Sequence, residues 1–216
     1  MKLSGTPSLL RIAEHAALSE VTLTGSVLDI GGDKNSAYQS IFKGTYSLTT
    51  MNLDPKTSPD IVGDLEESLP LANALYDAVL LINVLEHIFN YRELLDESVR
   101  VLKPQGTLVI IVPFLFPVHP SPHDYHRFTA ETLRKECEMR GLEDIVITPL
   151  GSGVFSARYL LLDRLLPSPL RLFAYFTVRY VAACLDALFI LLTGVLGKRY
   201  DPAHYALGYC VTALKS

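Results

Sequence analysis

The segment Val27–Phe42, VLDIGGDKNSAYQSIF, constrains the fold of this chain more than any other. Its first four residues are apolar except for Asp29, which is the pattern of a buried strand that carries a carboxylate near its end. The pair Gly31–Gly32 follows, and glycines allow the backbone to approach a ligand closely. A helix is expected to begin near Asn35 or Ser36. A strand, a glycine turn and a helix together predict half of a nucleotide-cofactor site.

The residues of this turn favour one cofactor charge over the other. Hydride-transferring enzymes use the spacing G-x-G-x-x-G to seat a pyrophosphate on a helix N-terminus, and the turn here does not have it. Asp33 would repel a phosphate, whereas a carboxylate is favourable beside a cation. S-adenosylmethionine carries a sulfonium and an ammonium group. The charge of the turn therefore favours methyl transfer over hydride transfer.

Composition excludes several classes of protein. The 216 residues carry a net charge of −4, and no run of Lys or Arg exceeds two, so nucleic acid is not an expected partner. Three widely spaced cysteines without a C-x-x-C pair indicate reduced thiols in a cytoplasmic protein, with no metal site. Charged residues interrupt the first twenty positions, so we expect no secretory signal but an amphipathic N-terminal helix.

Apolar runs that alternate with helical periodicity predict a single α/β domain over residues 1–216, with a Rossmann-like, seven-stranded, mostly parallel sheet flanked by helices. Helices are expected at Tyr91–Val101 and at Thr129–Arg140, with Thr129 as the N-cap and Gly141 as the terminating glycine. The predicted strands are Val27–Gly31, Tyr46–Leu53, Asp60–Val62, Tyr76–Ile82, Thr107–Val112, Glu143–Thr148 and Tyr209–Leu214.

Residues 154–200 are far more apolar than an ordinary connection between two strands, and they predict a helical insert before the last strand. Pro167 and Pro169 are expected to divide the insert into two helices. Eighteen residues, Tyr180–Gly197, are interrupted by one charge, Asp186, which is a borderline length for a membrane span. A central Asp is costly in hydrocarbon, so a lid, a dimer surface or a membrane-interfacial helix are the favoured alternatives.

Five landmarks in order resemble class I S-adenosylmethionine-dependent methyltransferases of the type 11-like group, often associated with small molecules, polysaccharides and lipid-linked glycans. The likeness extends over Val27–Pro149 and resumes at Gly208–Lys215, about two thirds of the chain. The landmarks are VLDIGG at 27–32, DIVGDLEESLPL at 60–71, YDAVLLINVLEHI at 76–88, RVLKPQGTLVIIVPF at 100–114 and HPSPHDYHRFT at 119–129.

The resemblance implies S-adenosylmethionine as the cofactor and assigns residues to its parts. It places Asp29, Gly31 and Gly32 at the methionine part of the cofactor. Asp54, at the end of the second strand, is expected to accept the ribose hydroxyls, although a turn before Pro55 would also use an Asp. The remaining implied binding residues are Asp64 and Leu65 at the adenine ring, and Asn83 and Glu86 at the mouth of the cleft.

The segment 113–129, which we call the acceptor loop, contains an unusual density of titratable groups. An oxygen nucleophile must lose its proton during methyl transfer, so a neutral His or a carboxylate is needed as general base. The histidine spacing in this loop, H-x3-H-x2-H, implies no metal-ligand geometry. A structural role is the alternative: Asp124 would pair with Arg127 and fix the loop, and Phe128 would enter the core. The candidate bases are His87, His119, His123, Asp124 and His126.

The leading hypothesis is methyl transfer to an oxygen of a sugar, a lipid-linked glycan or a small metabolite. Methylation of nitrogen or carbon is the alternative within enzymes, and a catalytically inactive binding protein with the same fold is the alternative outside them. Asp33 and Asn35 stand at positions where the family commonly has glycine, which supports that last alternative. In the enzyme, the apolar insert is expected to hold the acceptor or to bring the protein to a lipid-bound one. Residues 154–197 are expected to contact the inner face of a membrane or a second copy of the chain.

Overall fold

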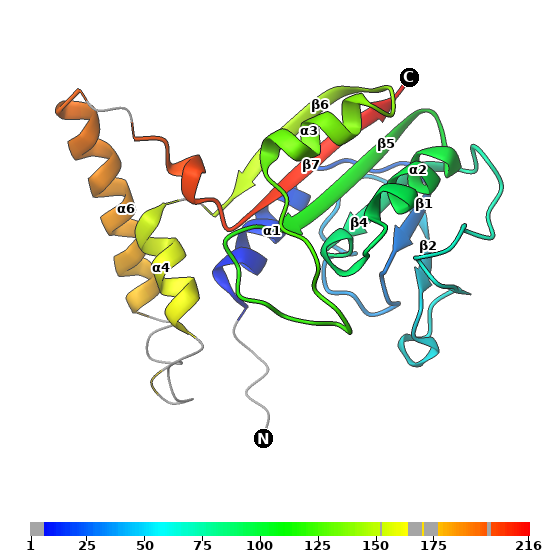
Figure 1. Ribbon diagram of the computed structural model, residues 1–216, viewed down its shortest axis with the longest axis horizontal. Helices are drawn as coiled ribbons and strands as arrows, with labels where there is room; N and C mark the ends of the chain where they lie inside the picture. The colour runs from blue at the N-terminus through cyan, green and yellow to red at the C-terminus, as the bar shows by residue number, and fades with distance from the viewer. Residues whose placement is uncertain (1–6, 152, 164–169, 171–176, 198–199) are drawn as a thin grey trace.

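The computed structural model describes residues 7–151, 153–163, 170, 177–197 and 200–216. In this part of the chain one seven-stranded sheet has the order β3-β2-β1-β4-β5-β7-β6 (Figure 1). Only β7 runs antiparallel to its neighbours. The predicted sheet is confirmed, and every predicted strand overlaps an observed one. The strands are β1 (Gly25–Ile30), β2 (Tyr46–Asn52), β3 (Ile61–Val62), β4 (Tyr76–Ile82), β5 (Leu102–Pro113), β6 (Leu142–Leu150) and β7 (Gly208–Lys215).

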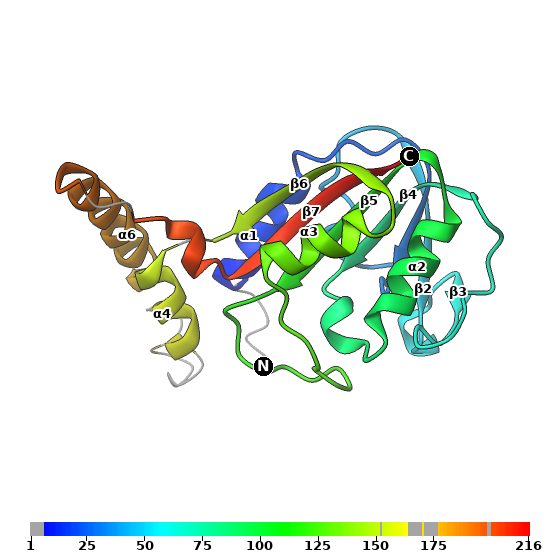
Figure 2. The same cartoon turned by 45° about the horizontal axis from the view of Figure 1, so that its top comes forward.

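Helices cover both faces of the sheet (Figure 2). Successive strand residues point to opposite faces, so Val27 and Leu28 of β1 enter two different apolar cores. Helices α2 (Tyr91–Val101) and α3 (Ala130–Glu138) pack on one face, and α1 (Leu9–Leu18) packs on the other. This three-layer arrangement buries nearly every residue of the central strands.

Local sequence signals set the ends of these helices. The hydroxyl of Thr129 accepts the N–H of Thr132 and caps α3, and Gly141 follows the helix with a left-handed φ of +69°. The hydroxyl of Ser8 accepts the N–H of Arg11 and caps α1. Three of the four helices predicted outside the insert are therefore confirmed: the N-terminal helix, Tyr91–Val101 and Thr129–Arg140.

The prediction of a helix after the glycine turn is wrong. Residues 31–45, all of which the structure describes, form turns without a helix. A carboxylate oxygen of Asp33 accepts the N–H of Asn35 at 2.8 Å, and the Asp33 N–H is donated to the hydroxyl of Ser36. Short polar side chains that bind the nearby backbone compete with helix formation, and three of them stand together here. Tyr38 and Phe42 then anchor the turns in the core.

The turn within the β5 segment holds Gln105 in a left-handed conformation with φ of +62°. We expect Gln105→Gly to raise the free energy of unfolding by about 0.5–1 kcal/mol, because glycine adopts this conformation without the clash of a Cβ atom. Chemical denaturation measures the effect. Gln105→Ala is the matched control, since alanine keeps the Cβ atom, and an equal gain in both variants would contradict the explanation.

The insert begins and ends at one point of the sheet, since Leu150 of β6 pairs with Gly208 of β7. Within it, α4 (Val154–Asp163) packs against α6 (Val178–Val195), and the two lie at one end of the molecule (Figure 1). Among the described residues of the insert, α4 and α6 lie on either side of Pro167 and Pro169 in the sequence, and the two prolines, expected to separate two helices, lie outside the described residues.

Asp186, the one charge in the apolar run, lies between α4 and α6 with 4% of its surface exposed. Its carboxylate accepts the N–H groups of Phe155 and Ser156, both at 2.9 Å, and the Ser156 hydroxyl at 2.6 Å. These groups belong to the first turn of α4, where helix N–H groups lack partners within the helix. Asp186 therefore caps α4 from a neighbouring helix, and its charge does not face outward.

Candidate active site

A cavity of about 760 Å³ opens at the carboxyl ends of β1, β2 and β4. The chain continues from β1 to β2 on one side and returns to β4 on the other, so the cavity lies at the point where the strand order reverses. Open α/β sheets bind ligands at this point. The cavity is lined by Gly31, Asn52, Leu53, Asp54, Thr57, Asp64, Leu65, Glu66, Asn83, Val84, His87, Ile88, Ser121, Pro122, His123 and Tyr125.

The glycine turn forms one wall of the cavity. Gly31 lines it with φ of +80°, and the side-chain amide of Asn52 donates to the carbonyl of Gly31 at 2.8 Å. Gly32 does not line the cavity, and a Cβ atom there would lie 2.1 Å from the Asp29 carboxylate. Asn52, which the sequence analysis did not single out, therefore fixes the turn from the adjacent strand end.

Asp29 supports the turn from inside the protein. Its side chain is fully buried and does not line the cavity. The hydroxyl of Tyr38 donates to its two oxygens at 2.9 and 3.1 Å, and the amide of Gln39 donates at 3.3 Å. Burial raises the pKa of Asp29 to about 7, against the lowering effect of these bonds. The structure thus places Asp29 behind the glycine turn, where it positions the backbone.

Three carboxylates from loops after β2 and β3 line the cavity: Asp54, Asp64 and Glu66. Asp54 accepts the N–H of Lys56 at 2.9 Å, so its turn-forming role is present as well. Asp64 accepts the N–H of Glu66 at 2.9 Å, and Leu65 beside it is buried. Asp33 does not line the cavity. This wall is suited to a ligand that is cationic or rich in hydrogen-bond donors.

Glu66 is a residue that the sequence analysis did not assign to the site. Its carboxylate oxygens accept the N–H groups of Phe89 at 2.7 Å and Asn90 at 3.1 Å. These amides immediately precede α2 and have no partner within that helix. Glu66 therefore ties the loop after β3 to the start of α2 across the cavity, a long-range contact without a local sequence signal.

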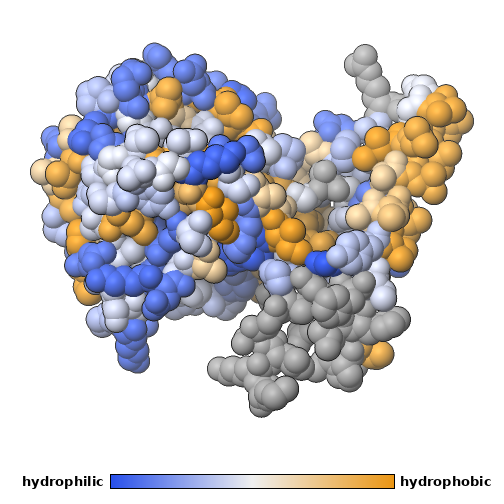
Figure 3. Space-filling model, turned by 180° about the vertical axis from the view of Figure 1, so that it is seen from behind, coloured by the Kyte–Doolittle hydropathy of each residue, from blue (hydrophilic) through white to orange (hydrophobic). Residues whose placement is uncertain are grey.

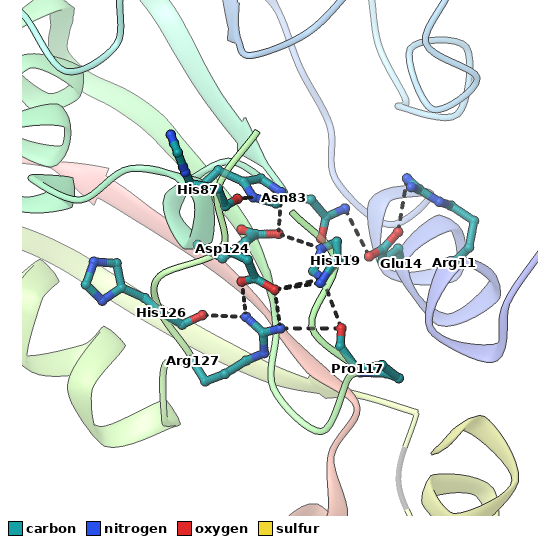
Figure 4. Close-up of polar contacts among 11 residues, drawn as sticks. Arg11, Glu14, Asn83, His87, Pro117, His119, Asp124, His126 and Arg127 are labelled. Carbon is teal, nitrogen blue, oxygen red and sulfur yellow. Dashed lines mark hydrogen bonds and ion pairs between the residues drawn. The ribbon is translucent and has the colours of Figure 1, made fainter. Parts of the chain in front are cut away.

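Asn83, directly after β4, connects the cavity to α1 (Figure 4). It adopts a left-handed φ of +54°, and its amide donates to Glu14 at 3.1 Å. Glu14 is 2% exposed, and its second oxygen lies 3.2 Å from the Arg11 guanidinium. Burial raises the pKa of Glu14 above its usual value. The buried Glu14 on an amphipathic helix is a further functional candidate that sequence reasoning missed.

The acceptor loop is fixed by an ion pair between Asp124 and Arg127, with contacts of 2.5 and 2.7 Å. The guanidinium holds the pKa of Asp124 far below its usual range, and the Asp124 side chain is 2% exposed. Phe128 enters the core, as expected. His126 lies 3.2 Å from the carbonyl of Phe89 through Nε2. Neither Asp124 nor His126 lines the cavity, so their described contacts are structural.

Two of the five candidate bases, His87 and His123, line the cavity. Nδ1 of His87 lies 2.5 Å from the backbone carbonyl of His123. A carbonyl only accepts, so this nitrogen carries a proton, and in the neutral imidazole Nε2 is then the acceptor. The loop after β4 and the acceptor loop thus meet at these two histidines.

Glu86 and His119 lie beside His87, outside the cavity lining. Glu86 is fully buried, and neither of its carboxylate oxygens has a hydrogen-bond partner in the described part of the chain. Nε2 of His87 and Nε2 of His119 are each 3.7 Å from Oε1 of Glu86. The Glu86 carboxylate is the largest influence that raises the pKa of His119. The predicted site residues are therefore divided between the cavity wall and this neighbouring cluster.

Comparisons with known proteins agree with this geometry. Residues 28–110 match the family model described as a methyltransferase domain. No curated protein matches the sequence significantly. A methyltransferase dependent on S-adenosylmethionine from Archaeoglobus fulgidus is similar in structure, with a TM-score of 0.56 and 16% identity, over 96% of this chain and 92% of that one.

A second match is phosphoethanolamine N-methyltransferase 2 of Haemonchus contortus with S-adenosylhomocysteine, with a TM-score of 0.58 and 16% identity, over 94% of this chain. This chain spans about half of that enzyme, 52%. The same enzyme also matches with S-adenosylmethionine bound. The [4+2]-cyclase SpnF matches with a TM-score of 0.59 and 18% identity, over 95% of this chain and 81% of that one.

The predicted fold class and cofactor class thus agree with the matched structures, two of which hold S-adenosylmethionine or its product. Identities of 16–18% establish the fold and leave the acceptor open. The chain therefore has the Rossmann-like fold of S-adenosylmethionine-dependent methyltransferases, and its residues 28–110 match the methyltransferase domain in sequence as well.

Proposed function

We propose that this protein transfers a methyl group from S-adenosylmethionine to an acceptor oxygen. The observation that carries the proposal is a single cavity with three carboxylates on one wall and two histidines on another, at the reversal point of the sheet. The carboxylates favour a cationic cofactor, and a histidine supplies the base that an attacking hydroxyl requires.

In this proposal the cofactor lies along the carboxylate wall. Gly31 contacts its methionine part, Asp54 accepts from the ribose hydroxyls, and Asp64 with Leu65 holds the adenine ring. Asp29 and Gly32 do not contact the cofactor and support its binding by holding the glycine turn in position. The acceptor enters beside Ser121 and Tyr125 of the acceptor loop, which line the same cavity. Most of the rate enhancement then comes from alignment of donor and acceptor.

The first test is titration calorimetry with S-adenosylmethionine, S-adenosylhomocysteine and NAD. We expect binding of the first two and none of NAD. Asp54→Ala is expected to weaken S-adenosylmethionine binding by about tenfold, since one lost hydrogen bond at a ribose is worth about 1.4 kcal/mol. Asp60→Ala is the control, because Asp60 lies on the same loop and pairs with Lys34 outside the cavity. Equal effects would exclude Asp54 from the ribose role.

We assign the general base to His123, which lines the cavity, with His87 as the alternative. His123→Ala is expected to lower turnover by about 100-fold or more while cofactor affinity stays unchanged. An acceptor screen among sugars, lipid-linked glycans and small amines provides the assay. His126→Ala is the matched control, because His126 belongs to the same loop but not to the cavity lining. Full activity of His123→Ala would assign the general base to His87 instead. If only amines react in the acceptor screen, N-methylation would be favoured over O-methylation.

We further propose that α6 lies on the cytoplasmic surface of an anionic lipid bilayer. Within the described residues α6 alone is long and apolar enough to cross a membrane, by length and composition, with a mean hydropathy of 1.8. Only Ala182 and Asp186 of this helix are buried. Figure 3 shows that its outer surface is largely hydrophobic. The exposed large apolar residues of α6 and of its C-cap are Val178, Tyr180, Val181, Leu185, Leu188, Phe189, Ile190, Leu191, Leu192, Val195 and Leu196.

Charge favours lipid over a second copy as the occupant of this surface. Residues 154–200 contain six Lys or Arg and two Asp, although the whole chain has a net charge of −4. A basic, apolar segment on an acidic protein is attracted to anionic headgroups. Protein interfaces have polar rims, whereas the apolar residues of α6 extend around most of the helix. Asp186 does not oppose insertion, because α4 satisfies its carboxylate.

Vesicle flotation tests this surface. The full chain is expected to float with vesicles of phosphatidylcholine and phosphatidylglycerol, and more weakly with phosphatidylcholine alone. Leu188→Asp with Leu191→Asp is expected to abolish flotation. Val146→Asp is the control, since Val146 is an exposed apolar residue of β6, 57% accessible. A dimer in light scattering that these two substitutions dissociate, without flotation of the wild type, would show that a second copy covers α6.

A further inference from the structure

One carboxylate and two imidazoles meet beside the cavity. Glu86 and His87 belong to the short 3₁₀ turn after β4, Leu85–His87, and His119 belongs to the acceptor loop. One ligand atom from each of these three residues lies within 4.8 Å of the other two. The cluster is intramolecular and joins segments 32 residues apart, which is why the histidine spacing within the acceptor loop did not reveal it.

Glu86 is the residue that requires an explanation. Its side chain is 0% exposed, and its two oxygens lack hydrogen-bond partners among the described residues. A buried carboxylate without partners is strongly unfavourable, so such groups are paired or coordinate a metal. Glu86 is aimed at His87 and His119, the two groups nearest to it with nitrogen donors or lone pairs.

Both histidines turn Nε2 toward Glu86 and Nδ1 toward other acceptors. Nδ1 of His87 donates to the carbonyl of His123 at 2.5 Å, and Nδ1 of His119 faces the carbonyl of Pro117 at 3.1 Å. Asp124 also lies 3.3 Å from Nδ1 of His119. A histidine that ligates a metal through one nitrogen usually donates its other N–H to a carbonyl or a carboxylate. Both rings have this arrangement.

The separation of the ligand atoms fits a metal better than a hydrogen bond. Each Nε2 lies 3.7 Å from Oε1 of Glu86, which is too long for an N–H···O bond. Bonds of about 2.1 Å in a tetrahedral site place ligand atoms about 3.4 Å apart. Small shifts of the side chains would close the cluster around one ion.

We propose that Glu86, His87 and His119 bind one divalent transition-metal ion, with Zn²⁺ as the expected occupant. Two imidazoles and one carboxylate form a donor set that Zn²⁺ uses in three-ligand sites with an open fourth position. The sequence-based expectation of no metal considered the cysteines and the acceptor-loop histidines, but not Glu86 together with His87, and this proposal replaces it. If the methyl transfer proposed above takes place, the ion would lower the pKa of an acceptor hydroxyl near the cavity, and His123 would remain the base.

The test begins with the full chain stripped by a chelator and dialysed. Zn²⁺, Co²⁺ and Mg²⁺ are then titrated separately by calorimetry, with metal content confirmed by elemental analysis. We expect one equivalent of Zn²⁺ or Co²⁺, visible Co²⁺ absorption bands typical of nitrogen and oxygen ligands, a higher melting temperature with Zn²⁺, and no binding of Mg²⁺. Absence of Zn²⁺ and Co²⁺ binding to the wild type would overturn the proposal.

Variants assign the metal to these residues. His119→Ala is expected to lower Zn²⁺ affinity at least about tenfold and to remove the Co²⁺ bands. His126→Ala is the matched control from the same loop, and it should bind as the wild type does. Binding that survives in His119→Ala would place the ion elsewhere and overturn the assignment.

Glu86→Gln separates the metal site from an ion pair between Glu86 and protonated histidines. If Glu86 is a metal ligand, its replacement by a neutral amide is expected to raise the melting temperature of the metal-free protein. The same replacement is expected to abolish the increase in melting temperature that Zn²⁺ causes in the wild type. If the carboxylate is paired with an imidazolium, the same replacement lowers the melting temperature. None of these measurements requires turnover, so failure of the methyl-transfer proposal would leave the metal result intact.

Discussion

Arg127→Ala is expected to lower the free energy of unfolding by about 3–5 kcal/mol, the cost of leaving a buried charge without its partner. Asp124 is the charge concerned, with 2% of its side chain exposed and two contacts to the guanidinium. The Asp124 carboxylate also accepts the N–H of His119 at 2.8 Å. Loss of Arg127 therefore displaces the acceptor loop, and turnover is expected to fall with stability.

Chemical denaturation of four proteins measures this effect: wild type, Arg127→Ala, Asp124→Asn and the double variant. The double variant should be more stable than Arg127→Ala, because it carries no unpaired carboxylate. Arg134→Ala is the matched control on α3, where the guanidinium contacts only a backbone carbonyl at 3.4 Å among its described partners. Equal losses in Arg127→Ala and Arg134→Ala would show that the Asp124 pair contributes little.

Asp29→Asn is expected to make the protein more stable above neutral pH. Burial raises the pKa of Asp29 from 3.8 to about 7, a difference that corresponds to about 4 kcal/mol. Below pH 3.8 the folded and unfolded states both hold the proton. Between pH 3.8 and about 7 only the folded state holds it, so stability decreases as pH rises through this window and stays low above it.

Denaturation at pH 4, 6 and 8 tests this pH dependence. Wild type and Asp29→Asn should be nearly equal at pH 4, and the variant should be more stable by up to about 4 kcal/mol at pH 8. Other titrating groups are common to both proteins and cancel in the difference. Asp29→Asn retains an oxygen that accepts from Tyr38. A difference independent of pH would show that Asp29 titrates near its ordinary pKa.

The fold was largely predictable because its strands and helices have strong local signals. The apolar run Tyr76–Ile82 and the helix Tyr91–Val101 have the predicted boundaries, and Thr129 caps α3 as its position before an amphipathic run indicates. The helix predicted after the glycine turn is absent for a local reason and a tertiary one. The side chains of Asp33 and Ser36 bind the nearby backbone, a signal that the sequence contains, whereas the core contacts of the turn are visible only in three dimensions. Tyr38 and Phe42 stabilise a series of turns through core contacts, and tertiary packing overrides weak local preference.

The site was predictable where residues follow strand ends. Gly31, Asp54, Asp64 and Asn83 line the cavity because parallel strands end at the same edge of the sheet. Partners that reach the site from other elements were not predictable. Glu14 comes from the far end of the sequence and Glu66 binds the start of α2, so neither contact has a periodicity or a spacing that reports it.

The histidines show the same distinction. Loop sequence identified His119, His123 and His126 together, yet His123 lines the cavity, His119 faces Glu86, and His126 packs on Tyr91 and Phe128. Their residue types are alike and their backbone neighbours are shared. Only the path of the loop over the protein separates them, and that path depends on the buried pair of Asp124 with Arg127.

The pairing of Leu150 with Gly208 makes the insert a detachable module. Because the last residue of β6 and the first of β7 are partners in an antiparallel pair, a short hairpin turn can join them without a change in the register of any strand. A relative could therefore gain or lose residues 151–207 as a unit and keep the cavity intact. The proposed membrane contact and the proposed chemistry could then evolve separately, since α4 and α6 belong to the insert and the cavity belongs to the sheet.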